Sequence, residues 1–279
     1  MPLHLAVNDV DALRERCETA EVRTIRDRPE YERGAVIPSG LWQPLTEPVG
    51  RTLTAPSWTP PSTLVEIVRP PEPGEDDQEH LADEMCDPDV QYLGQARAKA
   101  NMTTTTENYA AGLLLGLHLD NWDKLIHGAK ARGRRRLALN LGPGTRYIIL
   151  GGLDAQAVCR AVHPDDYALR HPHTNDYREH VAAGNPIRVV RVRISPGEGY
   201  IAPTEYLLHD GSTERPGRAV RHGLLARPLV PRSPALPHMR RPAGGGCSYA
   251  GSPPKHRWAS ADSPIPILTP ARRHPQVNG

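Results

Sequence analysis

The sequence predicts a mainly β fold with a few inserted helices, of the double-stranded β-helix or jelly-roll type. Three observations predict it. Short segments alternate apolar and polar residues, turn-forming Pro and Gly residues separate them, and helical periodicity is confined to a few short segments. A jelly roll folds such strands into a squashed, cupin-like barrel with a site in its mouth. With 279 residues, 38% of them hydrophobic, the chain can bury one such core.

Residues 1–35 are predicted to form an N-terminal helical extension. Asn8 or Asp9 can cap a short helix, because either side chain accepts hydrogen bonds from the first turn. The apolar face of this helix comprises Val10, Leu13 and Cys17. Residues 28–61 are rich in Pro and Gly, which predicts an extended arm with short strands. The expected buried anchors of this arm are Leu41, Trp42 and Leu45.

Residues 36–213 are predicted to form the jelly-roll domain. Its predicted strands are 62–69, the run that starts at Leu113, 135–141, 147–150, 186–195 and 199–209. Its predicted helices are 78–86, one capped by Asp154, and one from Thr174 to Gly184. Residues 70–77 and the basic segment 124–134 are predicted to be loops.

Residues 214–279 are predicted to be a largely unstructured tail. They contain ten Arg and one Lys against Glu214 and Asp262, which gives a charge of +9 where residues 1–213 carry −7. They also contain twelve Pro and show no strand or helix period. Such a composition buries too little apolar surface to offset the entropy of ordering the chain.

The cysteines and the termini indicate the compartment. Cys17, Cys86, Cys159 and Cys247 lack the spacing of a zinc site or a disulfide framework, so we expect reduced thiols. The sequence has no apolar run long enough to span a membrane and no leader at Met1, so we expect a cytoplasmic protein without membrane contact.

The apolar run from Leu113 ends in a His and an Asp two residues apart. In a strand, residues i and i+2 face the same side, so His118 and Asp120 present an imidazole and a carboxylate to one point. His209 also ends an apolar strand and supplies a third ligand. Two His and one carboxylate with open positions form the facial site of non-haem Fe(II) oxygenases. The alternatives are a capped surface turn at His118 and a hydrogen-bonded strand-end histidine at His209.

Other histidines are expected to lie outside the site. His163 and Asp165 repeat the spacing, but Pro164 between them indicates a turn after a helix. His171 and His173 lie in a polar, Pro-containing loop and are expected to face solvent.

Three phrases resemble the Fe(II)- and 2-oxoglutarate-dependent oxygenases, in particular small bacterial members of that superfamily. They are Gly-Leu-His-Leu-Asp-Asn-Trp-Asp at 116–123, Leu-Asn-Leu-Gly-Pro-Gly-Thr-Arg-Tyr at 139–147 and the segment 199–213 that contains His209. The resemblance covers residues 36–213. It implies that His118, Asp120 and His209 hold Fe(II), and that 2-oxoglutarate and dioxygen are co-substrates for oxidation of a small molecule. It also implies ascorbate as a reductant in vitro.

A 2-oxoglutarate site needs a cation for the distal carboxylate, and a guanidinium binds two oxygens at once. Many relatives place an Arg about ten residues after the second His, which corresponds here to Arg218 or Arg221. Others use a cation on the strand after the His-x-Asp pair. Period two places Arg135 on the face of Leu137 and Leu139, which we expect to be the inner one. The candidates in order of preference are Arg135, Arg136 and Arg146, and a solvated basic loop is the alternative.

The C-terminus departs from the resemblance, because relatives continue after Thr213 into an aromatic-rich last strand and this chain contains no Phe. We hypothesise a frameshifted ending, in which a one-base shift in GC-rich codons would convert residues 218–227 into such a strand. A basic tail would otherwise favour polyanion binding. With a frameshifted tail, a nucleic-acid partner is not expected.

Two functions from different classes follow. The first is an Fe(II)/2-oxoglutarate oxygenase that hydroxylates an amino acid or biosynthetic intermediate and converts 2-oxoglutarate to succinate. The second is a non-catalytic, cupin-like protein that binds a metal or a small molecule. Metal binding without 2-oxoglutarate decarboxylation would distinguish the second from the first.

Overall fold

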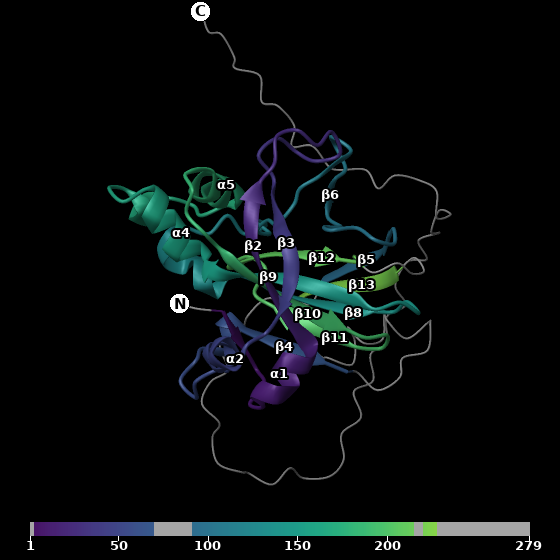
Figure 1. Ribbon diagram of the computed structural model, residues 1–279. Helices are drawn as coiled ribbons and strands as arrows, with labels where there is room; N and C mark the ends of the chain where they lie inside the picture. The colour runs from purple at the N-terminus through teal and green to yellow at the C-terminus, as the bar shows by residue number, and fades with distance from the viewer. Residues whose placement is uncertain (1–2, 70–90, 215–219, 228–279) are drawn as a thin grey trace, which may run out of the picture. The chain divides into compact units, whose positions relative to one another are not determined.

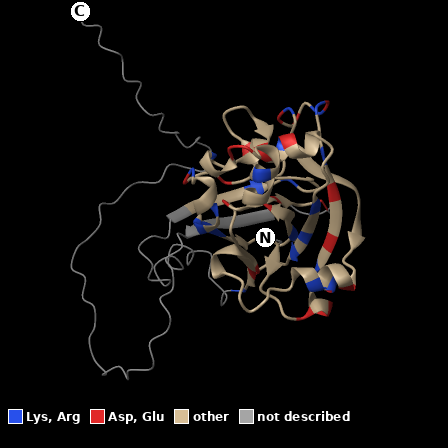
Figure 2. Ribbon diagram, turned by 90° about the vertical axis from the view of Figure 1, so that its left-hand side faces the viewer, with Lys and Arg blue, Asp and Glu red and all other residues tan. Residues whose placement is uncertain are grey.

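The computed structural model describes residues 3–69, 91–214 and 220–227, which belong to one compact unit spanning Met1–Pro231 (Figure 1). The predicted loop 70–77 and the predicted helix 78–86 lie outside the described residues. Figure 2 shows acidic and basic positions interspersed along the described strands and helices. None of the described helices is long and apolar enough to cross a membrane.

Two larger sheets and one hairpin contain the described strands. The six-stranded sheet has the order β1 (His4–Leu5), β4 (Leu64–Val68), β11 (Gly199–Ala202), β8 (Arg135–Asn140), β13 (Val220–Arg227) and β5 (Gln91–Ala98). The five-stranded sheet has the order β12 (Leu207–Ser212), β9 (Arg146–Asp154), β10 (Arg188–Ile194), β2 (Cys17–Thr24) and β3 (Val36–Pro44). The hairpin pairs β6 (Glu107–Asn108) with β7 (Leu113–Leu114). The prediction of a mainly β chain is confirmed, in open sheets rather than a closed barrel over the described residues.

The main core lies between the two larger sheets. Ile148 and Leu150 of β9 pack with Ala138 of β8 and Ala202 of β11 in one cluster. Ile149, on the other face of β9, joins a second cluster under two helices. Because both faces of β9 are covered, its sequence is a continuous apolar run rather than an alternating one.

The helices lie at the ends of the sheets and over one face. They are α1 (Val10–Arg16), α2 (Glu47–Leu53), α4 (Ala155–Val162) and α5 (Thr174–Ala182), with 3-10 turns η1 (Pro61–Thr63), η2 (His127–Arg132) and η3 (Tyr167–Leu169). Asp9 caps α1 and Asp154 caps α4, as predicted. The helices α4 and α5 lie side by side (Figure 1) and cover the outer face of the five-stranded sheet. Gly184, with φ of +86°, follows α5 as predicted.

The N-terminal prediction needs two corrections. Residues 1–35 are not a helical extension, because β2 pairs with β10 inside the five-stranded sheet. The alternation of apolar and polar residues in β2 was hard to recognise because charged residues occupy its exposed face. Leu41 is 83% exposed, whereas Leu45 is buried as predicted. Gly40, with φ of +74°, interrupts the alternation of β3 and turns Leu41 outward.

The prediction that no strand follows Thr213 is also wrong. Strand β13 pairs with β8 on one side and with β5 on the other. Strand pairing is made by backbone hydrogen bonds, so a basic sequence can form a strand. The segment also contains the apolar residues Val220, Leu224 and Leu225. The missing strand was the main reason for the frameshift hypothesis, which loses that support. The rest of the predicted tail, from residue 228 onward, lies outside the described residues.

Candidate metal centre

His118 and His209 face each other across a single antiparallel bridge between two chain segments. The expected long strand from Leu113 is not formed, because β7 ends at Leu114. Gly116 has φ of +70°, and a Cβ there would overlap the carbonyl oxygen of Val36, so the chain bends at this point. The bridge to β12 then orients His118. The predicted juxtaposition of His118 and Asp120 is observed without the predicted strand.

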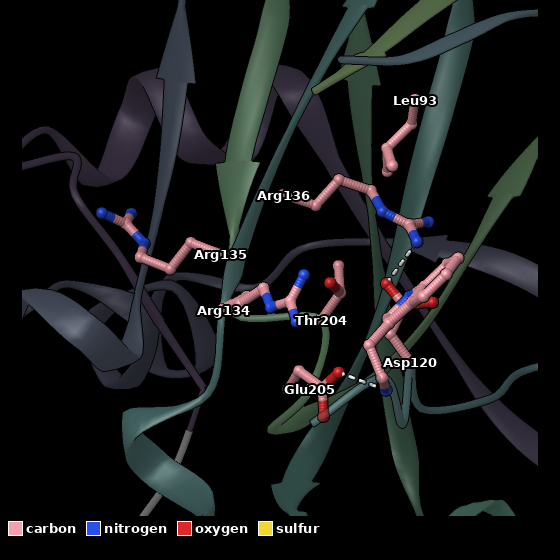
Figure 3. A pocket seen from close by; sticks show the side chains of 8 residues that line it. Leu93, Asp120, Arg134, Arg135, Arg136, Thr204 and Glu205 are labelled. Atoms are coloured by element: carbon pink, nitrogen blue, oxygen red, sulfur yellow. Dashed lines mark hydrogen bonds and ion pairs between the residues drawn. The ribbon is translucent and has the colours of Figure 1, made fainter. Parts of the chain in front are cut away.

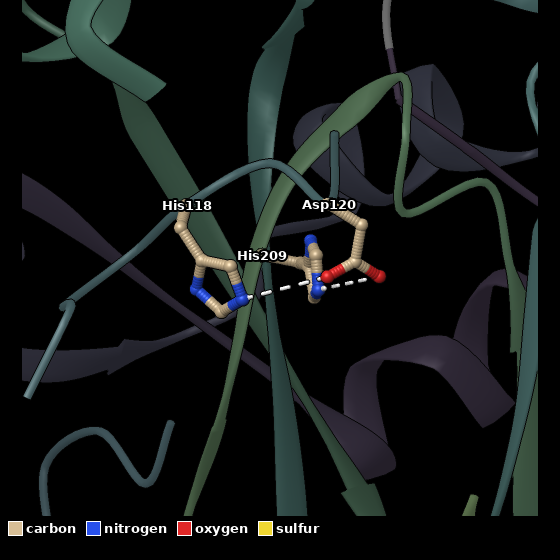
Figure 4. Close-up of side chains that lie close together, drawn as sticks. All are labelled: His118, Asp120 and His209. Carbon is tan, nitrogen blue, oxygen red and sulfur yellow. Dashed lines mark ion pairs between the residues drawn. The ribbon is translucent and has the colours of Figure 1, made fainter. Parts of the chain in front are cut away.

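Three side chains converge at this bridge (Figure 4). One ligand atom from each of His118, Asp120 and His209 can be chosen so that all lie within 4.8 Å of one another. The Nε2 atom of His118 is 3.7 Å from Asp120 Oδ1, and that of His209 is 3.8 Å from Asp120 Oδ2. The exposed fractions are 4%, 8% and 2%, respectively. The three buried ligands would shield a metal ion bound between them from bulk water on the side that faces the protein.

The tautomers of both imidazoles are set by backbone carbonyls. His118 Nδ1 lies 3.0 Å from the oxygen of Gly116, and His209 Nδ1 lies 3.1 Å from the oxygen of Leu207. A carbonyl only accepts, so each Nδ1 carries the proton and each Nε2 presents a lone pair to the centre. Such outer hydrogen bonds are the usual way in which ligating histidines are oriented. His209 Nε2 is buried without a hydrogen-bond partner, which fits a metal ligand.

The electrostatics keep Asp120 charged and His209 neutral, as metal ligation requires. Burial raises the pKa of Asp120, but Arg136 and the two imidazoles outweigh it, so this pKa is lowered. Burial lowers the pKa of His209 to about 4, which keeps its ring neutral at neutral pH. Burial also lowers the pKa of His118, but the carboxylates of Asp210 and Asp120 reverse the shift and raise it. One carboxylate and two imidazoles form a donor set for a divalent transition metal.

No protein-family model, curated protein or solved structure matches the chain. The chemistry of the centre therefore has to follow from its own residues. Among the described residues, one group of potential ligand side chains has a geometry that could hold a metal ion. It consists of His118, Asp120 and His209.

The three candidate arginines occupy different places. Arg135 points away from the centre (Figure 3) and donates to the backbone oxygen of Leu64 and to Glu66. The prediction that Arg135 lies on the inner face is wrong. Its neighbours Leu137 and Leu139 form a separate cluster on the outer face of the six-stranded sheet. Because both faces of β8 are apolar, alternation did not distinguish inside from outside.

Arg136 faces the centre and contacts a ligand directly. Its Nη2 lies 2.6 Å from Asp120 Oδ2 (Figure 3), and its side chain is 13% exposed. Arg136 pairs across the sheet with Ala202, which belongs to the main core. Its guanidinium therefore compensates the charge of Asp120 instead of pointing free into a co-substrate site.

Arg146 is the buried cation without a carboxylate partner in the described chain. It is 6% exposed, and its Nε and Nη1 atoms have no hydrogen-bond partner. Nη2 donates to Thr105 Oγ1 at 3.4 Å. The guanidinium lies against Gly211, where a Cβ would overlap Nη2. Gly211 and His209 pair with Ile148 and Leu150, which share the inner face, so Arg146 and His209 lie on the same side.

Asp210 is a functional candidate that the sequence analysis missed. Its Oδ1 accepts from the backbone N–H groups of Thr105 and Thr106, both at 3.1 Å, and from Thr106 Oγ1 at 3.0 Å. Its Oδ2 lies 3.6 Å from His118 Nδ1 and has no hydrogen-bond partner in the described chain. A charged residue that follows Leu207 and Leu208 in a buried strand needs partners, and this was the available signal.

A buried ion pair supports the loop after Asp120. Lys130 Nζ lies 3.3 Å from Glu205 Oε2, and their side chains are 0% and 1% exposed. Glu205 Oε1 accepts from the backbone N–H of Trp122 at 2.6 Å, and Lys130 also donates to Asn121 at 2.9 Å. Burial lowers the pKa of Lys130 and raises that of Glu205. The segment 124–134, predicted as a basic loop, contains the 3-10 turn η2 and supplies a buried cation.

The remaining candidates lie elsewhere. His163 contacts Asp176 at 3.2 Å, His171 contacts the carbonyl of Lys124, and His173 caps α5. Arg218 lies outside the described residues, and Arg221 belongs to β13.

Proposed function

We propose that this protein is an Fe(II)/2-oxoglutarate-dependent oxygenase that hydroxylates a small molecule. The convergence of two imidazole Nε2 atoms and one buried carboxylate carries the proposal. In the overall reaction, one oxygen atom of dioxygen enters a substrate C–H bond and the other enters succinate, while 2-oxoglutarate loses carbon dioxide. When bound together, Fe(II), 2-oxoglutarate and dioxygen supply this oxidising chemistry.

His118, Asp120 and His209 would hold the metal. Three protein ligands leave further positions of an octahedral ion open for a chelating co-substrate and dioxygen. Both histidines are preset by their bonds to carbonyl oxygens, so little rotamer freedom is lost when the metal binds. Arg136 contacts one oxygen of Asp120 and compensates the charge of this buried carboxylate while no metal is bound.

Arg146 would bind the distal carboxylate of 2-oxoglutarate. Of the three candidate arginines, it alone combines deep burial with two unpartnered nitrogen atoms and an inward position. A buried guanidinium without an anion is costly, so an anionic ligand would offset its desolvation. Thr105 Oγ1 accepts a hydrogen bond from Nη2 and so helps to hold the guanidinium in place.

The proposal includes the jelly-roll form of the fold. The chain passes from one larger sheet to the other between β8 and β9, between β10 and β11, and at both ends of β12. Such alternation places the ends of several strands around one opening of a double-layered fold. The bridge at His118 and the start of β12 lie within this arrangement.

The test is succinate formation by the purified full chain with Fe(II), ascorbate, 2-oxoglutarate and air. We expect succinate above the level of a His118→Ala control and loss of succinate with a chelator. We also expect Arg146→Gln to raise the KM for 2-oxoglutarate about tenfold or more without abolishing metal binding.

Two results would contradict the proposal. If Co(II) titration detects no binding that depends on His118 and His209, the group is not a metal centre. If metal binds but no succinate forms with any substrate, the protein is the non-catalytic, cupin-like binding protein of the second hypothesis.

A further inference from the structure

A cleft of about 430 Å³ is lined in part by Thr105, whose backbone N–H donates to Asp210 near the metal centre. Its walls come from the segment 101–107, from the segment 28–31 and from the end of β5. This volume falls within the range of small-molecule sites in proteins. The cleft was not expected from the sequence and plays no part in holding the metal.

The wall of the cleft is joined to the metal ligands. Thr105 lines the cleft, yet its backbone N–H and its hydroxyl both point to Asp210, at 3.1 and 3.5 Å. Asp210 in turn lies 3.6 Å from His118 Nδ1. Thr105 also accepts a hydrogen bond from Arg146. Thr105 therefore links the cleft wall to Asp210 and Arg146, which lie around the centre.

The cleft carries uncompensated charges of both signs. Arg28 and Glu30 lie 3.9 Å apart and neutralise each other. No ion pair within the described chain engages Arg97, Lys99 or Glu107, which also line the cleft. Arg97 and Lys99 are exposed and lie two residues apart, where β5 ends. Two cations and one carboxylate are suited to a ligand that has an anionic group and a cationic group.

We propose that the cleft binds a small zwitterion with a free carboxylate and a free ammonium group, as in an amino acid, and presents it to the metal centre. Arg97 and Lys99 bind the carboxylate, and Glu107 binds the ammonium group. Presentation to the metal rests on the proposed oxygenase function, whereas binding in the cleft does not.

The test is direct binding to the metal-free full chain, measured by saturation-transfer NMR. The probes are the L-amino acids, and for each one that binds, its carboxamide and its N-acetyl derivative. We expect at least one amino acid to bind with a dissociation constant of about 1 mM or lower. Both of its derivatives should bind at least about tenfold more weakly. No amino acid bound, or derivatives bound as well as the parent, would overturn the proposal.

Variants locate the site. The double variant Arg97→Gln/Lys99→Gln should weaken binding about tenfold, because it removes both cations from exposed positions that the fold does not require. The matched double variant Arg23→Gln/Arg188→Gln removes two exposed cations on the other sheet and should bind as the parent does. Equal loss in both doubles would show a general charge effect and would overturn the assignment to the cleft.

The succinate assay separates this proposal from the proposed function. Binding that depends on Arg97 and Lys99 supports the cleft even when no succinate forms, and in that case only the oxygenase function fails. Succinate formation that no bound amino acid stimulates overturns the presentation of the zwitterion to the metal.

Discussion

His118 and His209 donate backbone hydrogen bonds to each other, at N···O distances of 3.0 and 2.9 Å. This reciprocal pair ties a segment with no regular strand to the start of β12, and both imidazoles leave it toward Asp120. The relative position of two metal ligands is therefore fixed by main-chain atoms. Substitutions that preserve the backbone should change the ligands without moving their neighbours.

Arg136→Gln should increase the stabilisation that a metal ion confers. The guanidinium competes for Asp120 Oδ2 and repels a divalent cation, while in the metal-free protein it compensates a buried carboxylate. We expect a lower melting temperature without metal and a larger rise on adding Co(II), with severalfold tighter binding. Thermal melts with and without Co(II) measure both quantities.

Arg134→Gln is the matched control for this experiment. Arg134 pairs with Asp123 rather than with Asp120. Its Co(II) response should equal that of the parent chain. A smaller metal response in Arg136→Gln would mean that Arg136 supports the metal-bound carboxylate instead of competing for it.

Gly211→Ala should impair co-substrate binding while sparing the metal. The added methyl group would occupy the space of Arg146 Nη2 and Thr105 Oγ1, so the guanidinium has to shift. We expect the KM for 2-oxoglutarate to rise about tenfold, which corresponds to about 1.4 kcal/mol, with unchanged Co(II) affinity. Gly128→Ala is the control, because a Cβ at Gly128 meets no atom within 4 Å. An unchanged KM in Gly211→Ala would argue against Arg146 as the carboxylate ligand.

Lys130→Met should destabilise the protein by about 3–5 kcal/mol, because it leaves Glu205 buried without its cation. Urea denaturation measures the loss. The double variant Lys130→Met/Glu205→Gln should recover about 1–3 kcal/mol, since a neutral amide still accepts the N–H of Trp122. Arg51→Gln, which breaks an exposed pair with Glu47, should cost less than about 0.5 kcal/mol. Additive effects of the two buried substitutions would show that Lys130 and Glu205 do not stabilise each other.

Glu198→Gln should reduce stability at neutral pH and have little effect in acid. Burial raises the pKa of Glu198, but the Ser195 N–H and the guanidiniums of Arg16 and Arg69 outweigh it, so its pKa is lowered from 4.5. A lowered carboxyl pKa contributes stability above the unfolded pKa, and this is lost as the pH falls through the folded pKa. We expect a difference of about 1–2 kcal/mol at pH 7 that declines as the pH falls below 4.5 and through the lowered folded pKa. A difference that persists in acid would assign the effect to packing.

Much of the centre could be predicted from local spacing. Two residues at i and i+2 face one side in extended chain, and this held for His118 and Asp120 although no regular strand surrounds them. His209 was found because a histidine at an apolar strand stands out. The strands β8 to β12 were also visible from alternation or from short apolar runs. These features depend on neighbours in the sequence.

What could not be predicted depends on contacts between distant segments. The inner face of β8 is decided by which sheet covers it, so Arg135 and Arg136 could not be ranked from alternation. Lys130 looked like one more cation in a basic segment until Glu205 was placed beside it. Strand β2 carries Glu18, Glu21 and Arg23 among its apolar residues, and only its pairing with β10 reveals it as part of the sheet.

Strand β13 also determines what a shortened chain would lose. In the described part of the six-stranded sheet, β5 is the last strand and pairs with β13 alone. A protease cut or a stop codon just after Thr213 would leave both β5 and the edge of β8 without their partner. The described residues that line the cleft all lie between positions 28 and 114. Proteolytic sensitivity near residue 214 would therefore disable a pocket whose described walls come from the first half of the chain.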